Sequence, residues 1–352
     1  MDPVDVVAVV GGCPPERSHF AREVARSTGR MPIPAQRLAA APDPVVEAVA
    51  LVPWCSREQG ALVEFPDHAD VTELIGACAH PGSPAVLTGV VCVVDAAHVM
   101  ADLNREDCVL RPAVPHAPWH QIARALLHVM NVEFASAVVL VNWESLDTPQ
   151  LSSTMALLNH LAPHARLQLH RGAADGRAAV EWTAEALTDG TPYDITQERA
   201  GWVTLLNGEH DPFMADPHVS AVHYENVRPL HPGRLERLLE HRLESGEFGT
   251  VLRSAGFCRL ATRPDVTARW NHVGRMIAFS PLAVDQDLGE EDELLALGQD
   301  LGIIGLDLDV PALTAALDDA ALTDAEFAAG PEAWSLFPDR FPAWPTVSDR
   351  AD

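Results

Sequence analysis

The sequence predicts an α/β domain built on a parallel sheet, followed by a smaller α+β domain. Short continuous apolar runs alternate with segments of helical spacing in the first half, as is typical of strands buried on both faces. A turn-rich stretch follows at residues 186–217, and beyond it the pattern changes to separate strands and amphipathic helices. A chain of 352 residues is long enough for two domains.

The elements of the first half follow in order. Residues 5–10 predict a strand, residues 16–28 a helix, and the Pro- and Ala-rich residues 31–44 a loop. Strands and helices then alternate, with strands at 45–54, 86–95, 136–143 and 165–171 and helices at 70–80, 120–135 and 148–163. Thr148-Pro149 is a good helix start because proline suits the first turn.

The second half predicts a mixture of strands and helices. Strands are expected at 219–227, 257–263 and 275–281, a helix at 232–245, and a strand followed by a helix within 301–322. We therefore divide the chain into a first domain at 1–190, a linker at 191–217 and a second domain at 218–345.

Composition limits the chemistry. The net charge is −26, and all 24 basic residues are arginine, so no mechanism that needs a lysine amine can operate. An acidic chain avoids polyanions as a whole, but residues 228–275 are locally basic. The six cysteines form no CxC or CxxC pair, and no secretion signal or membrane-length apolar run is visible, so we expect free thiols, a cytoplasmic location and no membrane.

The stretch GGCPPERS at residues 11–18 follows a strand and opens a helix, as a phosphate-binding loop does. In the pattern GxxxxGK[ST], glycines let backbone N–H groups wrap the phosphates, the lysine meets their oxygens and the hydroxyl holds Mg²⁺. Gly11 and Ser18 of the pattern remain here, Gly12 adds a glycine at a variable position of the candidate site, and Arg17 stands at the lysine position. The planar guanidinium of Arg17 is not a geometric substitute for an ammonium.

Three further residues of this stretch oppose a phosphate. Pro14 and Pro15 each remove an N–H donor, and Glu16 replaces the second glycine with a negative charge. We therefore interpret the stretch as a degenerate nucleotide-binding loop whose strand–turn–helix is kept for packing.

Two more positions belong to the same degenerate site. Asp95 ends a predicted strand, as an acid that coordinates Mg²⁺ would, although it could equally cap a helix. Asn142 begins the tetrapeptide Asn-Trp-Glu-Ser, at the place where the family resemblance given below implies a guanine-binding NKxD motif. Ser145 is a poor replacement for the carboxylate and Trp143 replaces the lysine, so guanine selectivity is expected to be absent.

Three segments of the second half resemble the C-terminal domain of CobW-type proteins: RPLHPGRLERLL at 228–239, VLRSAGFCRLATRP at 251–264 and ALTDAEFAAGPEAW at 321–334. VVCVVDA and NVEFASAVVLVNWESLD in the first half are similar to later strands of that family's GTPase domain. The resemblance implies a degenerate P-loop NTPase-like parallel sheet followed by an α+β CobW C-terminal domain. The CxCC metal motif of the family is missing.

Family members are typically GTP-dependent metallochaperones or metal-homeostasis factors. The losses seen here resemble an actinobacterial branch that includes a factor recruiting a hibernation-promoting protein to ribosomes under zinc limitation. The leading hypothesis is a non-catalytic adaptor, with the ribosome (30S), a hibernation factor or other proteins as partners and no cofactor. The alternative is a divergent GTP-dependent zinc or cobalt metallochaperone, acting in metal homeostasis or cobalamin-type maturation with GTP, Mg²⁺ and zinc. A third hypothesis is a purely structural partner in a complex.

Two groups of residues outside the loop are candidates for contacts, and no catalytic residue is expected. An arginine segment with an aromatic residue could touch RNA or a partner. Its members are Arg253, Arg259, Arg263, Arg269, Trp270 and Arg275. The alternative is an ordinary sheet face that pairs with the acidic C-terminal region. His210, His218 and His223 are weak candidates for metal ligands, against the alternative of ordinary surface histidines.

Overall fold

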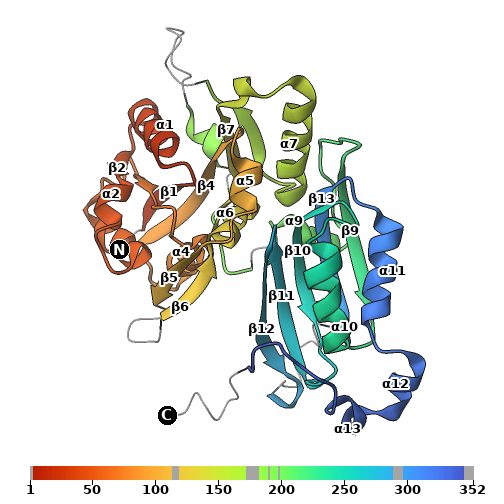
Figure 1. Cartoon of the computed structure of the whole chain (residues 1–352). Coiled ribbons are helices and arrows are strands. Elements are labelled where there is room, and N and C mark those ends of the chain that lie inside the picture. The colour runs from red at the N-terminus through yellow and green to blue at the C-terminus, as the bar shows by residue number, and fades with distance from the viewer. Residues whose placement is uncertain are drawn as a thin grey trace. The chain divides into compact units, whose positions relative to one another are not determined.

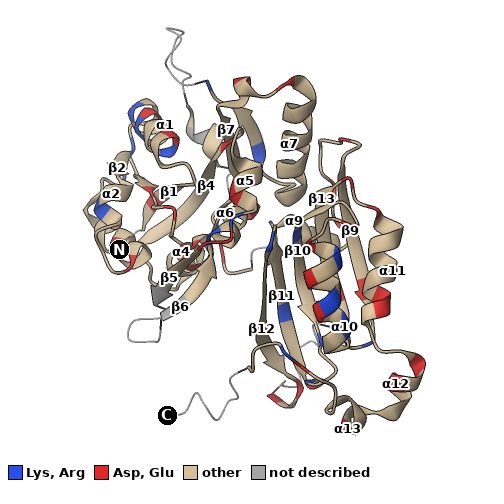
Figure 2. Cartoon of the chain, viewed as in Figure 1, with Lys and Arg blue, Asp and Glu red and all other residues tan. Residues whose placement is uncertain are grey.

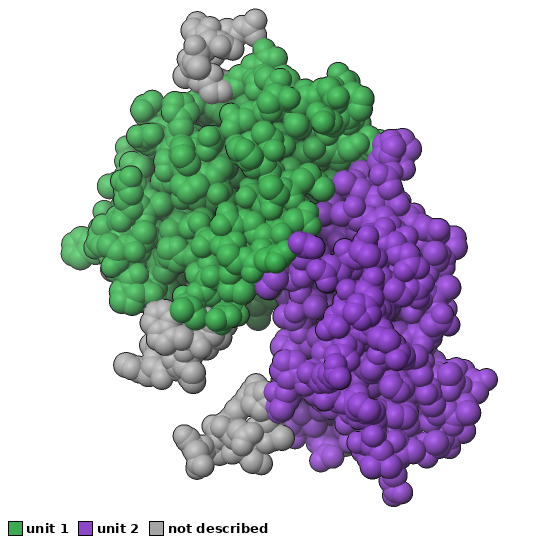
Figure 3. Space-filling model, in the orientation of Figure 1, with its two compact units in different colours: residues 1–201, 210–216 green, residues 202–209, 217–352 purple. Residues whose placement is uncertain are grey.

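The chain folds as two units (Figure 3), each built around one large β-sheet. The computed structural model describes residues 3–112, 119–171, 182–188, 191–196, 199–287 and 296–344. The first unit holds residues 1–201 and 210–216, and the second holds residues 202–209 and 217–352. The division therefore passes through the stretch expected to be a linker, in which the short helix α9 (Gly201–Leu206) forms.

The first unit carries a six-stranded sheet in the order β2-β3-β1-β4-β7-β8, with every pair of neighbours parallel. The strands are β1 (Val4–Val10), β2 (Met31–Ile33), β3 (Ala61–Glu64), β4 (Ala85–Asp95), β7 (Ala137–Val141) and β8 (Arg166–Leu169). The chain builds one side of β1 first and then crosses to the other side at β4. The predicted parallel α/β domain is thereby confirmed.

Helices connect these strands (Figure 1). They are α1 (Pro14–Thr28), α2 (Ala35–Leu38), α3 (Pro44–Leu51), α4 (Val71–Ala79), α5 (Val99–Leu103), α6 (Arg124–Glu133), α7 (Thr148–Leu161) and α8 (Ala184–Leu187). Helix α1 buries Phe20 and Val24 against Val7, Val9 and Val91 of the central strands. Its apolar side thus holds it against the middle of the sheet, with its N-terminus at the carboxyl edge.

The strand predicted at 45–54 is wrong, because that segment is α3 followed by a 3₁₀ turn at Val52–Trp54. Asp43 accepts hydrogen bonds from the N–H groups of Val45 and Val46, and Pro44 occupies the first turn, so the caps favour a helix despite the β-branched residues. The strand that pairs with β1 is instead β3, which the sequence analysis missed. The expected loop at 31–44 also contains β2 and α2.

Three other boundaries differ from expectation. Helix α1 begins at Pro14 instead of residue 16. The helix expected from 120 begins only at Arg124, because residues up to 123 belong to β6 (Trp119–Ala123), which pairs with β5 (Cys108–Pro112) as an antiparallel hairpin. The strand expected at 257–263 ends at Cys258. Helical spacing is a local signal and does not reveal where a segment pairs with a distant strand.

The second unit holds a five-stranded antiparallel sheet in the order β12-β11-β10-β13-β9. The strands are β9 (Val219–Asn226), β10 (Thr250–Cys258), β11 (Val266–Val273), β12 (Met276–Val284) and β13 (Gln299–Leu306). Helices α10 (Pro232–Arg237) and α11 (Val310–Ala320) pack on one face, where Leu235 and Leu313 join Trp270, Leu301 and Ile303 in the core. The predicted α+β second domain is confirmed.

The helices of this unit differ from one another in how their charged residues are arranged (Figure 2). Basic and acidic residues alternate along α10 and the π-helical turn Leu238–Leu243 that continues it, as pairing three or four residues apart requires. Two further helices, α12 (Asp324–Ala329) and α13 (Pro331–Trp334), complete the described chain and carry acidic residues in their first turns. Within the described ranges, no helix has both the length and the apolar character needed to cross a membrane.

Candidate functional site

The degenerate loop lies at the carboxyl edge of the parallel sheet, at the switch point between β1 and β4. Crevices at such points are where open α/β sheets bind their ligands. Gly11 follows β1 with φ 137°, and a Cβ at this position would lie 2.1 Å from the carbonyl oxygen of Val93 on β4. Only glycine fits here, so the close approach of two strands accounts for Gly11 without a phosphate.

Helix α1 begins directly after the loop, so residues 11–13 alone separate it from β1. Cys13 is the N-cap residue and makes no side-chain capping bond; its thiol instead donates to the carbonyl oxygen of Val93 at 3.3 Å. Pro14 and Pro15 fill the first helical positions and bring no N–H group. The edge therefore lacks two of the backbone donors that a helix N-terminus ordinarily offers to an anion.

Arg17 and Ser18, the residues at the lysine and hydroxyl positions, are both bonded within the protein. The Arg17 side chain is 3 % exposed, and its Nη1 donates to the carbonyl oxygen of Gly11 at 2.5 Å. Its Nε lies 3.2 Å from Oε1 of Glu64, to which Ser18 Oγ also donates at 2.5 Å. The other oxygen of Glu64 accepts from the N–H group of Ala35 at 3.3 Å.

Glu64 therefore joins α1, β3 and the start of α2 through one buried carboxylate. It neutralises the only cation of the degenerate loop and accepts the hydrogen of the hydroxyl that would hold Mg²⁺. Both groups would have to leave Glu64 before they could reach a nucleotide. Removing Arg17 from a buried carboxylate is expensive, because the remaining charge stays desolvated and unpaired.

Asp95 and Asn142, expected in the same degenerate site, contact each other. Asn142 adopts a left-handed conformation with φ 55°, and its Nδ2 donates to Oδ2 of Asp95 at 2.8 Å. Asp95 also accepts from the N–H group of Ala97 at 2.9 Å and lies 3.0 Å from Nδ1 of His98. The Asp95 carboxylate thus organises the turn after β4, whereas the N-cap residue of the following helix α5 is His98.

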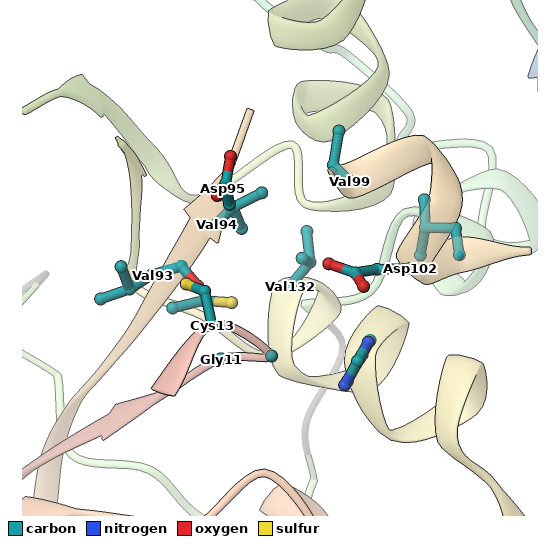
Figure 4. A pocket seen from close by; sticks show the side chains of 12 residues that line it. Gly11, Cys13, Val93, Val94, Asp95, Val99, Asp102 and Val132 are labelled. Carbon is teal, nitrogen blue, oxygen red and sulfur yellow. The ribbon is translucent and has the colours of Figure 1, made fainter. Parts of the chain in front are cut away.

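A small cavity remains between the loop, the end of β4 and helices α5 and α6 (Figure 4). Its volume is about 30 Å³, room for about two water molecules. Two acidic residues, Asp95 and Asp102, line the cavity. No arginine is among the described residues that line it. Burial raises the pKa of Asp102, an effect that the charge of Arg105 partly offsets.

His128 is the nitrogen-bearing side chain of the cavity wall, and its ring lies over Gly12. A Cβ on Gly12 would approach the ring to 2.7 Å. Burial lowers the pKa of His128 to about 4, so the imidazole is neutral near pH 7. Neither ring nitrogen has a hydrogen-bond partner among the described residues. The cavity therefore offers a nucleotide no positive charge.

These residues do not fit the Mg²⁺ and GTP that the resemblance implies. The space holds water at most, the lysine position is committed to Glu64, and two carboxyl groups would face the phosphates. We therefore derive no phosphoryl-transfer step for this chain.

The place of the guanine motif is also occupied. Ser145 Oγ donates to the carbonyl oxygen of Asn142 at 2.7 Å, so it closes its own 3₁₀ turn. The guanidinium carbon of Arg171 lies 4.6 Å from the centre of the Trp143 ring. Trp143 thus stacks on an arginine of its own unit.

Half of the expected arginine segment is buried, and this corrects the prediction of a contact surface. Arg253, Arg259 and Trp270 are 1 %, 3 % and 2 % exposed. Arg253 donates to Asn271 Oδ1 at 2.6 Å, and Trp270 Nε1 donates to Ser254 Oγ at 2.8 Å. Side chains with internal partners and no accessible surface cannot contact RNA or another protein. Trp270 faces the core, Arg253 lies on the opposite face of the sheet and Arg259 follows the end of β10, so no single periodicity in the sequence predicts the burial of all three.

Arg259 forms the most extensive of these networks. Its guanidinium makes two parallel hydrogen bonds of 2.7 Å to the carboxylate of Asp285 and a third of 2.7 Å to Thr267 Oγ1. Arg263 lies 3.0 Å from Asp339 and stacks on Trp344 at 4.3 Å. Both acids belong to the acidic C-terminal region, so these two arginines follow the alternative interpretation.

Arg269 and Arg275 are the remaining members. Arg269 is partly exposed and lies over the Trp202 ring at 5.5 Å, and Arg275 is exposed and lies 3.3 Å from Glu244. Together with the exposed part of Arg263 they leave a smaller basic surface than the sequence suggested.

The three candidate histidines occupy three separate pairs and form no common site. His210 belongs to the first unit, where it lies 3.0 Å from His160, and burial lowers its pKa to about 4. His218 lies 2.6 Å from Asp307, and His223 lies 2.7 Å from Asp300. The acidic neighbours were missed because they come from another strand, and only the pairing register would have revealed them.

Comparison with known proteins identifies the second unit. Residues 219–321 match the family model of the cobalamin synthesis protein cobW C-terminal domain. A zinc-regulated GTPase metalloprotein activator 1 of Dictyostelium discoideum is 28 % identical over 157 residues, which is 44 % of this chain and 31 % of that protein. The matched region is thus about a third of the relative's length.

Two solved structures of the YjiA GTPase are also similar at 13 % identity, each covering 92 % of this chain and 100 % of the other. They are the Zn(II)-bound enzyme from E. coli, with a TM-score of 0.37, and its Zn(II)-bound triple mutant, with a TM-score of 0.39. At such scores the fold assignment rests on the strand order and pairing given above. The chain therefore carries, at residues 219–321, a C-terminal domain of the CobW type.

Proposed function

We propose that this protein is a non-catalytic adaptor with a role in zinc-related metal homeostasis. The observation that carries the first part is the closure of the phosphate edge, where Arg17 and Ser18 are both bonded to Glu64. A side chain that is buried and paired in this way is not available for nucleotide. We further propose that residues 1–190 are a degenerate P-loop domain that serves as scaffold for the domain at 218–345.

The zinc-related part is supported by the name of the curated relative, which joins zinc regulation, a GTPase and the activation of a metalloprotein. Under our proposal this chain keeps a connection to zinc, acts through protein partners in the cytoplasm and has lost the nucleotide cycle. A loss of this kind keeps the fold, because strand pairing and helix packing do not depend on the residues that hold a phosphate.

Calorimetric titration of the purified protein with GTP and Mg²⁺ tests the proposal. We expect no binding heat, and metal analysis of the same sample guards against a site that needs zinc first. Micromolar affinity for GTP with turnover would instead support the alternative, a divergent GTP-dependent metallochaperone. Pull-down with the intact chain followed by mass spectrometry would then identify the partners of either form.

A finer version of the proposal places the adaptor at the small ribosomal subunit, or with a hibernation factor, as in the actinobacterial branch described above. Its support is limited to the partly exposed Arg263, Arg269 and Arg275. Cosedimentation with 30S or 70S particles at a stated salt concentration tests it, because phosphate contacts weaken as salt rises. A chain that stays at the top of the gradient, with and without hibernation factor, rules out this version and leaves the adaptor proposal intact.

A further inference from the structure

A histidine and two carboxylates converge on one face of the C-terminal sheet. His223 and Glu225 lie two residues apart on β9, so their side chains project from the same face. Asp300 of β13 is the cross-strand partner of Glu225 and therefore shares that face. Tyr224, between the two β9 residues, is buried in the core on the opposite face.

The three side chains bring their ligand atoms close together. One nitrogen of His223 and one oxygen from each carboxylate all lie within 4.8 Å of one another, and His223 Nε2 is 2.7 Å from Asp300 Oδ1. Zinc binds such atoms at about 2.0–2.2 Å, which places neighbouring ligands of a tetrahedral site about 3.4 Å apart. Small rotations of exposed side chains are enough to reach this spacing.

The electrostatics of the group favour a cation. Glu225 and Asp300 stand directly opposite each other on adjacent strands, an arrangement in which two like charges repel. Within the part of the chain that the structure describes, no arginine pairs with either carboxylate, and Asp300 is paired with His223 alone. A divalent ion between the two strands would remove this repulsion in a chain whose net charge is −26.

The surroundings shield one side of the group. Asp300 faces Phe257 on β10, and Phe257 packs edge-on against Trp202 of α9. The cross-strand partner of His223 is Gly302, where a Cβ would lie 2.9 Å from the backbone of Trp202. Glycine thus lets α9 lie close to the sheet beside His223, while the β9 side remains at the edge of the sheet. An apolar wall on one side limits the access of water to bound metal.

We infer that His223, Glu225 and Asp300 form a binding site for a divalent transition-metal ion, with zinc as the first choice. One imidazole with two carboxylates suits zinc and its neighbours, whereas Mg²⁺ and Ca²⁺ prefer oxygen ligands alone. Three protein ligands leave a coordination position open, as expected of a site that exchanges its ion. The site is independent of the phosphate edge, so it stands whether or not GTP binds.

Zinc affinity of the full chain, measured by competition with a chromogenic chelator, tests the site. His223→Ala, Glu225→Gln and Asp300→Asn should each weaken zinc binding by at least about tenfold, the smaller loss typical of removing even an outer partner of a metal ligand. His218→Ala is the matched control, because His218 also lies beside a carboxylate, Asp307, at 2.6 Å but has no third ligand within reach among the described residues. This control should bind zinc as the unmodified chain does.

Cobalt(II) provides a second readout that separates this site from the thiols. The bound ion should give weak visible bands that disappear in Glu225→Gln, without the intense thiolate charge-transfer band of cysteine ligation. Equal zinc affinity in all four variants, a thiolate band, or no binding by the unmodified chain would each overturn the inference. Glu225 is exposed, so its variant keeps the test valid even if the other two fold poorly.

Discussion

Arg17 donates from Nη1 to the carbonyl oxygen of Gly11 at 2.5 Å, so the side chain at the lysine position turns back onto its own loop. The same guanidinium pairs with the buried Glu64. Arg17 therefore has a structural role. Its substitution should first be examined for its effect on stability and only then for its effect on nucleotide binding.

Arg17→Met should lower the free energy of unfolding by about 3–5 kcal/mol, because it leaves Glu64 buried without its charge partner. Urea unfolding followed by circular dichroism measures the loss. Arg22→Met is the matched control, since Arg22 lies on the same helix, is exposed and, among the described residues, bonds to the carbonyl oxygen of Ser18 alone; a change within about 0.5 kcal/mol is expected there. Equal effects of the two substitutions would contradict the structural role of Arg17.

The double substitution Glu16→Gly with Arg17→Lys should not create a GTP site. Pro14 and Pro15 still withhold two N–H donors, and Ser145 still lacks the carboxylate that would read guanine. Calorimetry with GTP and Mg²⁺ should show no binding heat in a variant that remains folded. Micromolar affinity would mean that the loop is much closer to a working one than its geometry suggests.

Acid should destabilise the fold through its buried histidines. Burial lowers the pKa of His128 to about 4 and does the same for His272, beside the charge of Arg253. Unfolded histidine takes up a proton near pH 6.5, so between about 6.5 and 4 the unfolded state binds more protons and stability falls as pH falls. Each histidine should contribute on the order of 3 kcal/mol to this loss at its acid end.

Urea unfolding at pH 7 and about pH 5 measures the effect. In a double variant with His128→Gln and His272→Gln, the difference between the two pH values should shrink. His19→Gln is the control, because the His19 side chain is 51 % exposed and should leave the difference unchanged. A pH dependence that is the same in all three proteins would show that other groups cause the acid sensitivity.

Substitution of Arg259 should change stability, whereas substitution of Arg275 should change binding at the surface. Arg259→Ala leaves Thr267 and other buried acceptors without their donor and should cost about 1–3 kcal/mol of stability, whereas Asp285 is exposed enough to be solvated. Arg275→Ala, at an exposed ion pair, should cost less than about 1 kcal/mol and alone of the two could alter RNA or partner binding in a folded protein. A stable Arg259→Ala protein with weakened RNA binding would restore Arg259 to the contact surface.

Thiol reactivity should follow burial. Cys108 is exposed, whereas burial raises the pKa of Cys13, Cys78 and Cys258 to about 12. Alkylation of the native chain at neutral pH should therefore label Cys108 first, and mass spectrometry of timed samples measures the order. Unfolding in urea should make all six cysteines react at similar rates. Rapid native labelling of Cys13 would indicate that the loop opens.

Local signals in the sequence were sufficient to predict the layered fold, whereas the loss of nucleotide binding at the loop stays a prediction. Apolar runs such as β4 and β7 are unambiguous because both faces of a parallel sheet are covered. The misplaced strand at 45–54 shows the limit, since Val45 and Val46 have strand propensity but the cap at Asp43 decides for a helix. A capping side chain that directly precedes a short segment can therefore outweigh the strand propensity of the residues within that segment.

The candidate sites depended on contacts that no local pattern contains. Glu64 bonds Arg17 across 47 residues, and His223 meets Asp300 across 77. The burial of Arg253 follows from the register between β10 and its neighbours, which sets the face of every side chain. The sequence therefore indicates which residues no longer meet the requirements of phosphate binding. The side chains that these residues contact instead can be identified only from the folded chain.

The carboxylate of Glu64 also determines how such a protein can be controlled. A GTPase has two conformations because the γ-phosphate holds its switch segments in one state and releases them in the other. Here Arg17, Ser18 and the N–H group of Ala35 all bond to one internal carboxylate, that of Glu64. Under our proposed function this edge of the sheet does not alternate between two conformations. Regulation would then act through the amount of protein made, or through an ion or partner bound elsewhere on it.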